Sequence, residues 1–207
     1  MSAEADKIID LYRRHAEIWT ERRGELVIEQ KWLDRFIALL PKGAPVLDLG
    51  CGSGAPIGRH LLQRGFTMTG VDAAPELIEI AKSRESSGHW IATDMRGLDL
   101  QARFNGILAW HSLFHLRADD QRAMFAVFAQ HAKKGTVLMF TSGLKAGEAI
   151  GNFEGEPLYH ASLDAQEYHA LLNEYLFDVI EYVPEDPDCG GATVWLAQYI
   201  GGDQGRR

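Results

Sequence analysis

The sequence predicts an α/β fold in which helices cover a doubly wound, mostly parallel seven-stranded sheet. Three observations support this prediction. Short runs of strand-forming residues alternate with helical patterns between residues 46 and 141, which is typical of right-handed β-α-β crossovers. A turn with three glycines follows the first run. The last two strand patterns have no helix between them, so the C-terminal strand should be antiparallel.

Two helical patterns precede the first strand. One covers about Ala5 to Thr20, and the other covers about Glu25 to Leu40, where large apolar residues recur at intervals of three and four. The segment 41–45, which contains two prolines, stops the second helix. We expect residues 1–40 to form a helical cap or lid on a single domain that covers residues 1–207, because a chain of this length buries about 70% of its unfolded surface in one core.

The alternating part of the chain supplies five strands and three helices. In sheets of this kind, ligands bind beyond the carboxyl ends of the strands. The predicted strands are Val46 to Leu49, Thr67 to Val71, Trp90 to Thr93, Phe104 to Ala109 and Val137 to Thr141, and the predicted helices lie near Pro56 to Gln63, Pro75 to Ser83 and Ala118 to His131.

The C-terminal part breaks the alternation. Asp164 followed by Glu167 is a plausible helix start, and we expect that helix to run to about Leu176. Two strand patterns follow, and the segment 184–191 between them is too short for a crossover, so they should form a hairpin. If the first of these strands is parallel to the earlier ones, the hairpin loop lies on the ligand side of the sheet. The strands are Phe177 to Val183 and Thr193 to Ile200, and the loop carries Asp186, Asp188 and Cys189.

Glycines occur at every fourth position from 143 to 155, in a stretch without other periodicity. We interpret this stretch as a mobile loop rather than a packing seam.

Composition limits the partners. The chain has 29 acidic and 21 basic residues and a net charge of −8, which argues against nucleic acid as a partner. Only Cys51 and Cys189 are present, and the N-terminus is polar, so we expect a protein of the reducing cytoplasm. No apolar run approaches the ~20 residues that span a bilayer, and no membrane partner is expected. The sequence leaves the oligomeric state open.

The glycine turn is the most informative motif. The first predicted strand ends in Asp48 and is followed by Gly50, Gly52 and Gly54. Glycine permits a sharp turn with positive φ and a close approach of a ligand to the backbone. Such a turn at the start of a helix is typical of nucleotide binding, although glycine triplets alone are weak evidence.

Two further acids follow the next strands. Asp72 ends the second strand, where a carboxylate can accept both hydroxyls of a ribose; capping of the helix that begins at Pro75 is the structural alternative. Asp94 ends the third strand. Its carboxylate could accept from an adenine amino group, while Met95 offers a backbone N–H and an apolar wall.

In order and spacing, these motifs resemble class I S-adenosylmethionine-dependent methyltransferases over about Pro45 to Ile200, and bacterial small-molecule methyltransferases in particular. The resemblance implies a Rossmann-like methyltransferase fold, S-adenosyl-L-methionine as cofactor with S-adenosyl-L-homocysteine as product, and transfer of a methyl group to a small organic acceptor with an O or N nucleophile. The implied cofactor residues are Asp48, Gly50, Cys51, Gly52 and Gly54 in the glycine turn, Asp72 with Ala73 at the ribose, Asp94 with Met95 at the adenine, and Ala109 with Trp110 beside the methionine part.

The first helix carries aromatic and basic residues on about two turns. Similar methyltransferases use such a segment as a lid, so Tyr12, Trp19 and Arg23 could hold the methionine carboxylate and cover the sulfonium. An aromatic stripe that packs on the sheet, with solvated arginines, is an equal alternative.

Three histidines follow predicted strand ends on the ligand side. His111, His115 or His160 could act as a general base at neutral pH, if the acceptor arrives protonated; histidines packed in the core are the alternative. A metal site made from these histidines with the C-terminal hairpin loop lacks tight ligand spacing, and no metal is expected.

Two other functions fit parts of the sequence. An NAD(P)-dependent oxidoreductase could use Gly50, Gly52, Ala55 and Asp72, but Asp48 and the closing hairpin favour the methyltransferase. A non-catalytic sensor or regulatory protein could bind S-adenosylmethionine without transferring its methyl group, since cofactor motifs report binding only.

Overall fold

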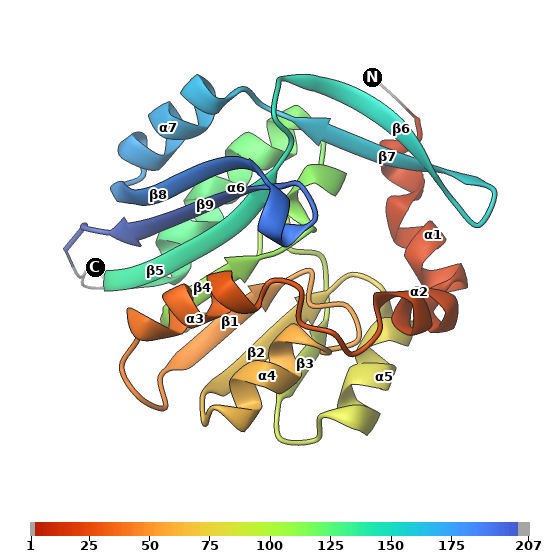
Figure 1. Ribbon diagram of the computed structural model, residues 1–207, viewed down its shortest axis with the longest axis horizontal. Coiled ribbons are helices and arrows are strands. Elements are labelled where there is room, and N and C mark those ends of the chain that lie inside the picture. Colours follow the sequence, from red (N-terminus) through yellow and green to blue (C-terminus); the bar gives the residue numbers. More distant parts are fainter. Residues whose placement is uncertain (1–2, 203–207) are drawn as a thin grey trace.

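The central element of the computed structural model is a seven-stranded sheet with the strand order β3-β2-β1-β4-β5-β9-β8 (Figure 1). The first five strands along the chain are parallel, and β9 is antiparallel to both β5 and β8. The structure describes residues 3–202, so the ends of the predicted domain 1–207 lie outside the described residues. The predicted fold class is therefore confirmed. The strands of the sheet are β1 (Pro45–Leu49), β2 (Thr67–Asp72), β3 (His89–Ala92), β4 (Phe104–Ala109), β5 (Ala132–Ser142), β8 (Phe177–Asp186) and β9 (Ala192–Tyr199).

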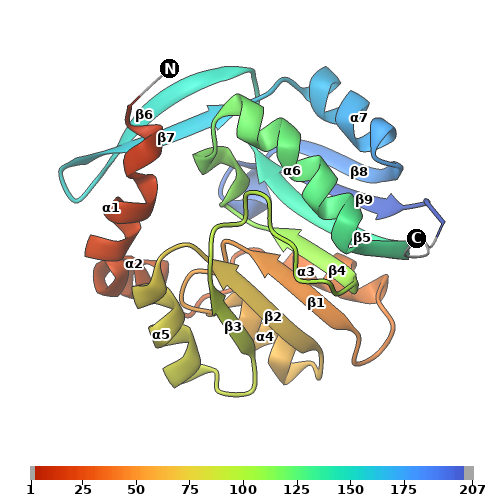
Figure 2. The same cartoon turned by 180° about the vertical axis from the view of Figure 1, so that it is seen from behind.

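Helices cover both faces of this sheet (Figures 1 and 2). On one face, α3 and α4 pack over a core that contains Trp32 and Phe36; on the other, α6 and α7 pack over a core that contains Phe125 and Tyr168. Among residues 3–202, no helix has the length and hydropathy needed to span a bilayer. The helices that follow β1 are α4 (Ile57–Gln63), α5 (Pro75–Arg84), α6 (Ala118–His131) and α7 (Ala165–Glu174), with short 3₁₀ turns at Leu113–His115 and Pro187–Cys189.

The order in which successive strands are added to the sheet changes direction at β1, because β2 lies on one side of β1 and β4 lies on the other. In open α/β sheets such a switch point opens a crevice at the carboxyl ends of the strands. The loops that carry the predicted site residues after β1, β2, β3 and β4 all emerge at this edge. As predicted, β8 is parallel to β5, so the β8–β9 turn lies at the same edge.

The N-terminal helices differ from the prediction. The expected helix Ala5 to Thr20 is divided into a 3₁₀ turn (Ala5–Lys7), α1 (Ile8–Arg14) and α2 (Ala16–Arg23). His15 lies between them at φ −111° and ψ 21°, outside helical geometry, and its Nε2 lies 2.7 Å from Glu156 Oε1. The following helix, α3 (Gln30–Ala38), begins five residues later than Glu25.

The prediction of a mobile loop at 143–155 is wrong. This stretch contains β6 (Gly147–Phe153), which pairs with β7 (Glu156–Ser162) in a separate two-stranded antiparallel sheet. Gly155, at φ 83°, forms the turn between the two strands. Because almost every residue of β6 is exposed, the strand lacks the apolar alternation that would identify it in the sequence. The hairpin lies beside α1 (Figures 1 and 2).

Candidate active site

The glycine turn wraps around the end of β2. The backbone N–H groups of Gly50 and Cys51 both donate to the Val71 carbonyl, at 2.7 and 3.0 Å. A Cβ on Gly50 would lie 2.3 Å from Ser112 Cβ, and a Cβ on Gly52 would lie 2.4 Å from Trp19 Cη2. Both glycines also have positive φ angles, of 78° and 55°. A side chain is therefore excluded at each position by contact as well as by conformation.

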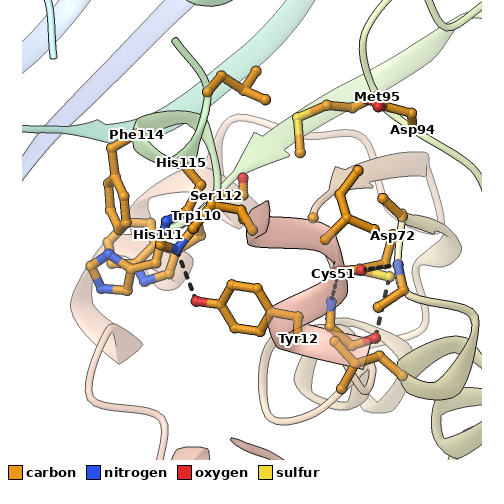
Figure 3. A pocket seen from close by; sticks show the side chains of 18 of the residues that line it. Tyr12, Cys51, Asp72, Asp94, Met95, Trp110, His111, Ser112, Phe114 and His115 are labelled. Atoms are coloured by element: carbon orange, nitrogen blue, oxygen red, sulfur yellow. Dashed lines mark hydrogen bonds between the residues drawn. The ribbon is translucent and has the colours of Figure 1, made fainter. Parts of the chain in front are cut away.

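Asp72 holds the turn and faces the crevice. Its Oδ2 accepts from the Gly52 N–H and its Oδ1 from the Ala74 N–H, each at 2.9 Å (Figure 3). Burial raises the pKa of this carboxyl above its usual range, and the hydrogen bonds from Ala74, Gly52 and Ala73 oppose that shift. The carboxylate joins the end of β2 to the glycine turn, and the lone pairs that remain can accept from a ligand.

Asp48 lies deeper, at the end of β1, and is 3% exposed. Burial, together with the charges of Asp72 and Glu29, raises its pKa to about 7, against the lowering effect of Arg23. The Arg23 guanidinium is paired with the fully buried Glu29 carboxylate. Close to Asp48, the carboxyl groups of Asp48, Asp72 and Glu29 thus outnumber the Arg23 guanidinium, which favours a cationic ligand.

A cavity of about 330 Å³ lies over these residues, and we call it the first cavity. It collects side chains from α1, α2 and the loops after β1, β2, β3 and β4. Trp110 is among its lining residues, and its Nε1 is buried without a hydrogen-bond partner in the part of the chain that the structure describes. The predicted site residues that line the first cavity are Tyr12, Trp19, Arg23, Asp48, Gly50, Cys51, Gly52, Asp72, Ala73, Asp94, Met95, Trp110, His111, His115 and His160.

Two predicted cofactor residues, Gly54 and Ala109, do not line the first cavity. A Cβ on Gly54 would lie 3.0 Å from Trp90 Cη2, so this glycine allows the turn to pack on β3. Ala109 is fully buried at the end of β4. Both residues therefore contribute to the packing around the first cavity and not to its wall.

Asp94 lies on the cavity wall with Arg96 beside it. The carboxylate accepts from the Arg96 backbone N–H at 2.9 Å and from Arg96 Nη2 at 2.6 Å. Burial opposes ionisation, but these bonds dominate and hold the pKa of Asp94 below its usual range. The carboxylate therefore stays ionised at neutral pH and can accept from a ligand amino group.

The N-terminal helices cover the first cavity through Tyr12 and Trp19. The Tyr12 hydroxyl lies 2.8 Å from His115 Nε2 (Figure 3). His115 Nδ1 lies 2.9 Å from the Tyr159 carbonyl. The carbonyl can only accept, so Nδ1 carries the proton and Nε2 accepts from Tyr12. Burial lowers the pKa of His115 to about 4, so the imidazole is neutral at pH 7 and both of its nitrogens are occupied.

Ion pairs fasten these helices to the β6–β7 hairpin. Arg14 Nη2 lies 2.5 Å from Glu156 Oε2, His15 also contacts Glu156, and Arg22 is paired with Glu154. The hairpin that the sequence failed to reveal is therefore one anchor of the helical cap, and α5 is another through the Arg13–Glu76 ion pair. That residues 1–40 act as a lid remains our proposal.

A second, open cavity of about 460 Å³ adjoins the first. The two cavities have His111, Phe114 and His160 in common, and we call these three residues the shared wall. Ring centroids within it are 5.7 Å apart for His111 and Phe114 and 5.3 Å apart for Phe114 and His160. His111 has a left-handed φ of 52°, and its N–H donates to Thr141 Oγ1 at 2.9 Å. Surrounding protein lowers the pKa of His111 to about 4 and also lowers that of His160.

The C-terminal hairpin loop lies at this edge, as predicted, but it forms no metal centre. Trp32 Nε1 donates to Asp186 Oδ2 at 2.8 Å, Lys31 is paired with Asp188, and Cys189 is buried in the core. No group of three metal-ligating side chains occurs within residues 3–202.

The sequence predicts that the segments 110–116, 144–160 and 185–191 together wall a compact acceptor pocket, and residues of all three segments line the second cavity. Glu29 and Ser112 were not singled out as site residues. Ser112 donates to the Leu49 carbonyl at 2.6 Å and fills the space beside Gly50. Nothing in the sequence pointed to Glu29, because an acidic residue just before a helix is expected at the exposed N-terminus of that helix and not as the buried partner of Arg23. Together, the two cavities can hold a nucleoside-bearing cation next to a second small molecule, with imidazoles between them.

Comparison with known proteins gives one family match. The model of a family described as "Methyltransferase domain" matches residues 18–186. A putative methyltransferase of Bacillus subtilis is 32% identical over 91 residues, which are 42% of this chain and 35% of that protein. An O-methyltransferase of Pyrenophora dematioidea is 27% identical over 172 residues, which are 77% of this chain and 64% of that protein. The matches to the first three curated relatives span 35% to 55% of the length of those proteins.

Solved structures share the fold. A 1,6-didemethyltoxoflavin-N1-methyltransferase of Burkholderia thailandensis, with bound S-adenosylhomocysteine, has a TM-score of 0.71 at 20% identity and covers 95% of this chain and 87% of its own. A magnesium protoporphyrin IX methyltransferase of Synechocystis, with bound SAH, has a TM-score of 0.73 at 16% identity and covers 94% of this chain and 99% of its own. At these identities the similarity concerns the fold.

Proposed function

The chain belongs to the methyltransferase-domain family, and on that premise we propose that it transfers a methyl group from S-adenosyl-L-methionine to an O or N atom of a small organic acceptor. The observation that carries this proposal is the shared wall. The first cavity is lined by the residues expected for the cofactor, and a second cavity meets it at two neutral imidazoles and a phenyl ring.

The residues of the first cavity fit this cofactor. Asp72 offers a carboxylate to the ribose hydroxyls, and Asp94 with Met95 offers an acceptor, a backbone N–H and an apolar wall to the adenine. Trp110, which lines this cavity, has a buried Nε1 donor without a partner among the described residues. When bound, the cofactor supplies a methyl group on a positively charged sulfur, and the carboxyl groups of this region favour such a cation over a neutral molecule.

Methyl transfer from a sulfonium is an in-line displacement, so alignment and exclusion of water supply most of the acceleration. The N-terminal helices exclude water by covering the first cavity with Tyr12 and Trp19. An acceptor that arrives protonated also needs a base. Since both nitrogens of His115 are occupied, we assign that proton to His111 or His160 of the shared wall, and we assign to His115 the role of holding Tyr12.

The proposed setting follows from charge and thiols. The net charge of −8 opposes binding to nucleic acid. Cys51 and Cys189 are both free and buried, which fits a reducing compartment. We therefore propose a small-molecule acceptor and a cytoplasmic reaction.

The test uses isothermal titration with S-adenosylmethionine, S-adenosylhomocysteine and NAD⁺, followed by incubation with methyl-labelled cofactor and a deproteinised metabolite extract. We expect both methionine nucleosides to bind, no binding of NAD⁺, and labelled product above a blank. Binding of NAD⁺ alone would indicate an oxidoreductase. Binding of the cofactor at micromolar concentration without any labelled product would favour a sensor.

A further inference from the structure

Half of the residues that line the second cavity are small. Eight of its sixteen lining residues are Gly or Ala. They come from three segments: the end of β5 with the start of β6, the end of β7, and the β8–β9 turn with Gly190 and Gly191. Small residues on facing segments leave a space in which a broad, flat molecule can lie against peptide groups.

The inner end of this cavity is made of rings. Phe114 lies between His111 and His160, with interplanar angles of 49° and 41° to them. Both imidazoles are neutral at pH 7, because burial lowers their pKa values. Three neutral rings at one end favour offset or edge-to-face contacts with another ring.

The charged lining residues do not call for a charged ligand. They are Lys145 and Glu148, and both are exposed. Glu148 already accepts from the Tyr159 hydroxyl at 2.9 Å. The hydroxyl of Ser142 accepts from Trp195 Nε1 and donates to the Gly143 carbonyl, at 2.9 Å each. The deep part of the cavity therefore presents neutral or occupied groups.

We propose that the second cavity binds a flat aromatic or heteroaromatic acceptor whose hydroxyl or ring N–H points to the shared wall. This rests on the proposed function and names its substrate class. In the transfer, a lone pair of the acceptor O or N forms the bond to the methyl carbon, and the carbon–sulfur bond breaks with its electrons going to sulfur. The proton of the acceptor goes to an imidazole of the shared wall.

Two neighbouring residues of β6 provide a matched pair of variants. Ala149 lies directly opposite His160 in the β6–β7 register, so their side chains share one face of the hairpin. Ile150 is next in the strand and faces the other way; it is 52% exposed and does not line either cavity. Ala149→Phe should fill the cavity beside His160, and Ile150→Phe should leave the cavity unchanged.

The experiment is ligand-observed NMR on the protein loaded with S-adenosylhomocysteine. The probes are 4-methylphenol, 2-naphthol and indazole, against cyclohexanol, cyclohexylamine and hexanoate. We expect the aromatic probes to bind at least tenfold more tightly than the aliphatic ones. Ala149→Phe should weaken the binding of the aromatic probes at least tenfold, whereas Ile150→Phe should change it by less than twofold. Both variants should bind S-adenosylhomocysteine within twofold of wild type.

The outcomes separate the two proposals. Equal or stronger binding of the aliphatic probes, absence of binding by any probe, or equal behaviour of the two variants would overturn the aromatic assignment. Failure of S-adenosylhomocysteine to bind would instead contradict the proposed function, and the same NMR comparison on the free protein would then decide the nature of the second cavity.

Discussion

Replacement of Asp72 by Asn tests the cofactor site most directly. The substitution keeps the shape of the side chain but removes its charge and one of its two acceptor oxygens. In the native protein both oxygens already accept from backbone N–H groups, those of Gly52 and Ala74, at 2.9 Å. The amide can satisfy only one of them and turns its NH₂ group toward the other. The ribose of a bound cofactor loses a charged acceptor at the same time.

The magnitude follows from these contacts. A hydrogen bond to a charged group contributes about 1.5–3 kcal/mol, and each 1.4 kcal/mol is about a tenfold change in affinity. We therefore expect Asp72→Asn to raise the Kd for S-adenosylhomocysteine about 10- to 100-fold, and Asp72→Ala to raise it at least as much. The unpaired N–H should also reduce the free energy of unfolding by about 1–3 kcal/mol.

The assay is isothermal titration, with thermal unfolding followed in parallel. Asp99→Asn is the control, because Asp99 also accepts a backbone N–H, that of Gln101, but lies outside the first cavity. The control should bind as wild type. A Kd within twofold of wild type for Asp72→Asn, with the native circular dichroism spectrum retained, would refute the assignment of Asp72 to the ribose.

Three further predictions concern the same cavity. Asp48, with a pKa of about 7, should release part of a proton when the cation S-adenosylmethionine binds at pH 7. The binding enthalpy of the wild type should therefore differ between phosphate and Tris buffers, and this difference should be smaller for Asp48→Asn. The same buffer difference in wild type and variant would contradict this prediction. The pKa of His115 is lowered to about 4, so the unfolded chain binds more protons than the folded one between pH 6.5 and 4, and stability is lost as the pH falls through this window. His115→Gln should therefore flatten the Tm–pH curve between these two pH values. A double-mutant cycle with Tyr12→Phe should give a coupling of about 0.5–1.5 kcal/mol, and additive effects would contradict the Tyr12–His115 hydrogen bond. Gly52→Ala would place its Cβ 2.4 Å from Trp19 Cη2, so it should raise the Kd for S-adenosylhomocysteine at least tenfold and change tryptophan fluorescence. Adding Trp19→Ala to this variant should restore part of the affinity. Wild-type affinity of the Gly52→Ala variant would show that the close approach of Gly52 and Trp19 is not needed for binding.

Much of the cofactor half of the site could be predicted from the sequence, because its chemistry is local. The glycine turn, Asp72 and Asp94 each follow a strand whose end is visible in the hydrophobic pattern. Parallel strands bring such ends to one edge, so their order along the chain was enough to bring them together. Gly54 differs from these residues because it does not line the first cavity: a glycine that allows close packing against Trp90 has the same sequence pattern as one that faces a ligand.

For the acceptor half, the three segments that line the second cavity could be predicted, but the strand pairing that holds them in place could not. β6 is exposed along nearly its whole length and contains Gly147 and Gly151, so neither periodicity nor strand propensity identifies it. The break between α1 and α2 at His15 depends on Glu156, which lies 141 residues away in the sequence. Contacts of this range leave no local pattern in the sequence.

The β6–β7 hairpin pairs only with itself and shares no strand ladder with the seven-stranded sheet. A change of length or sequence in it need not shift the register of any strand that carries the cofactor residues. Its ion pairs to Arg14, His15 and Arg22 involve two carboxylates, Glu154 and Glu156, whereas β7 also supplies the Tyr159 carbonyl that holds His115 and the His160 ring of the shared wall. Changes confined to β6, which lines the second cavity but not the first, can therefore alter acceptor preference while the nucleoside-binding half stays constant.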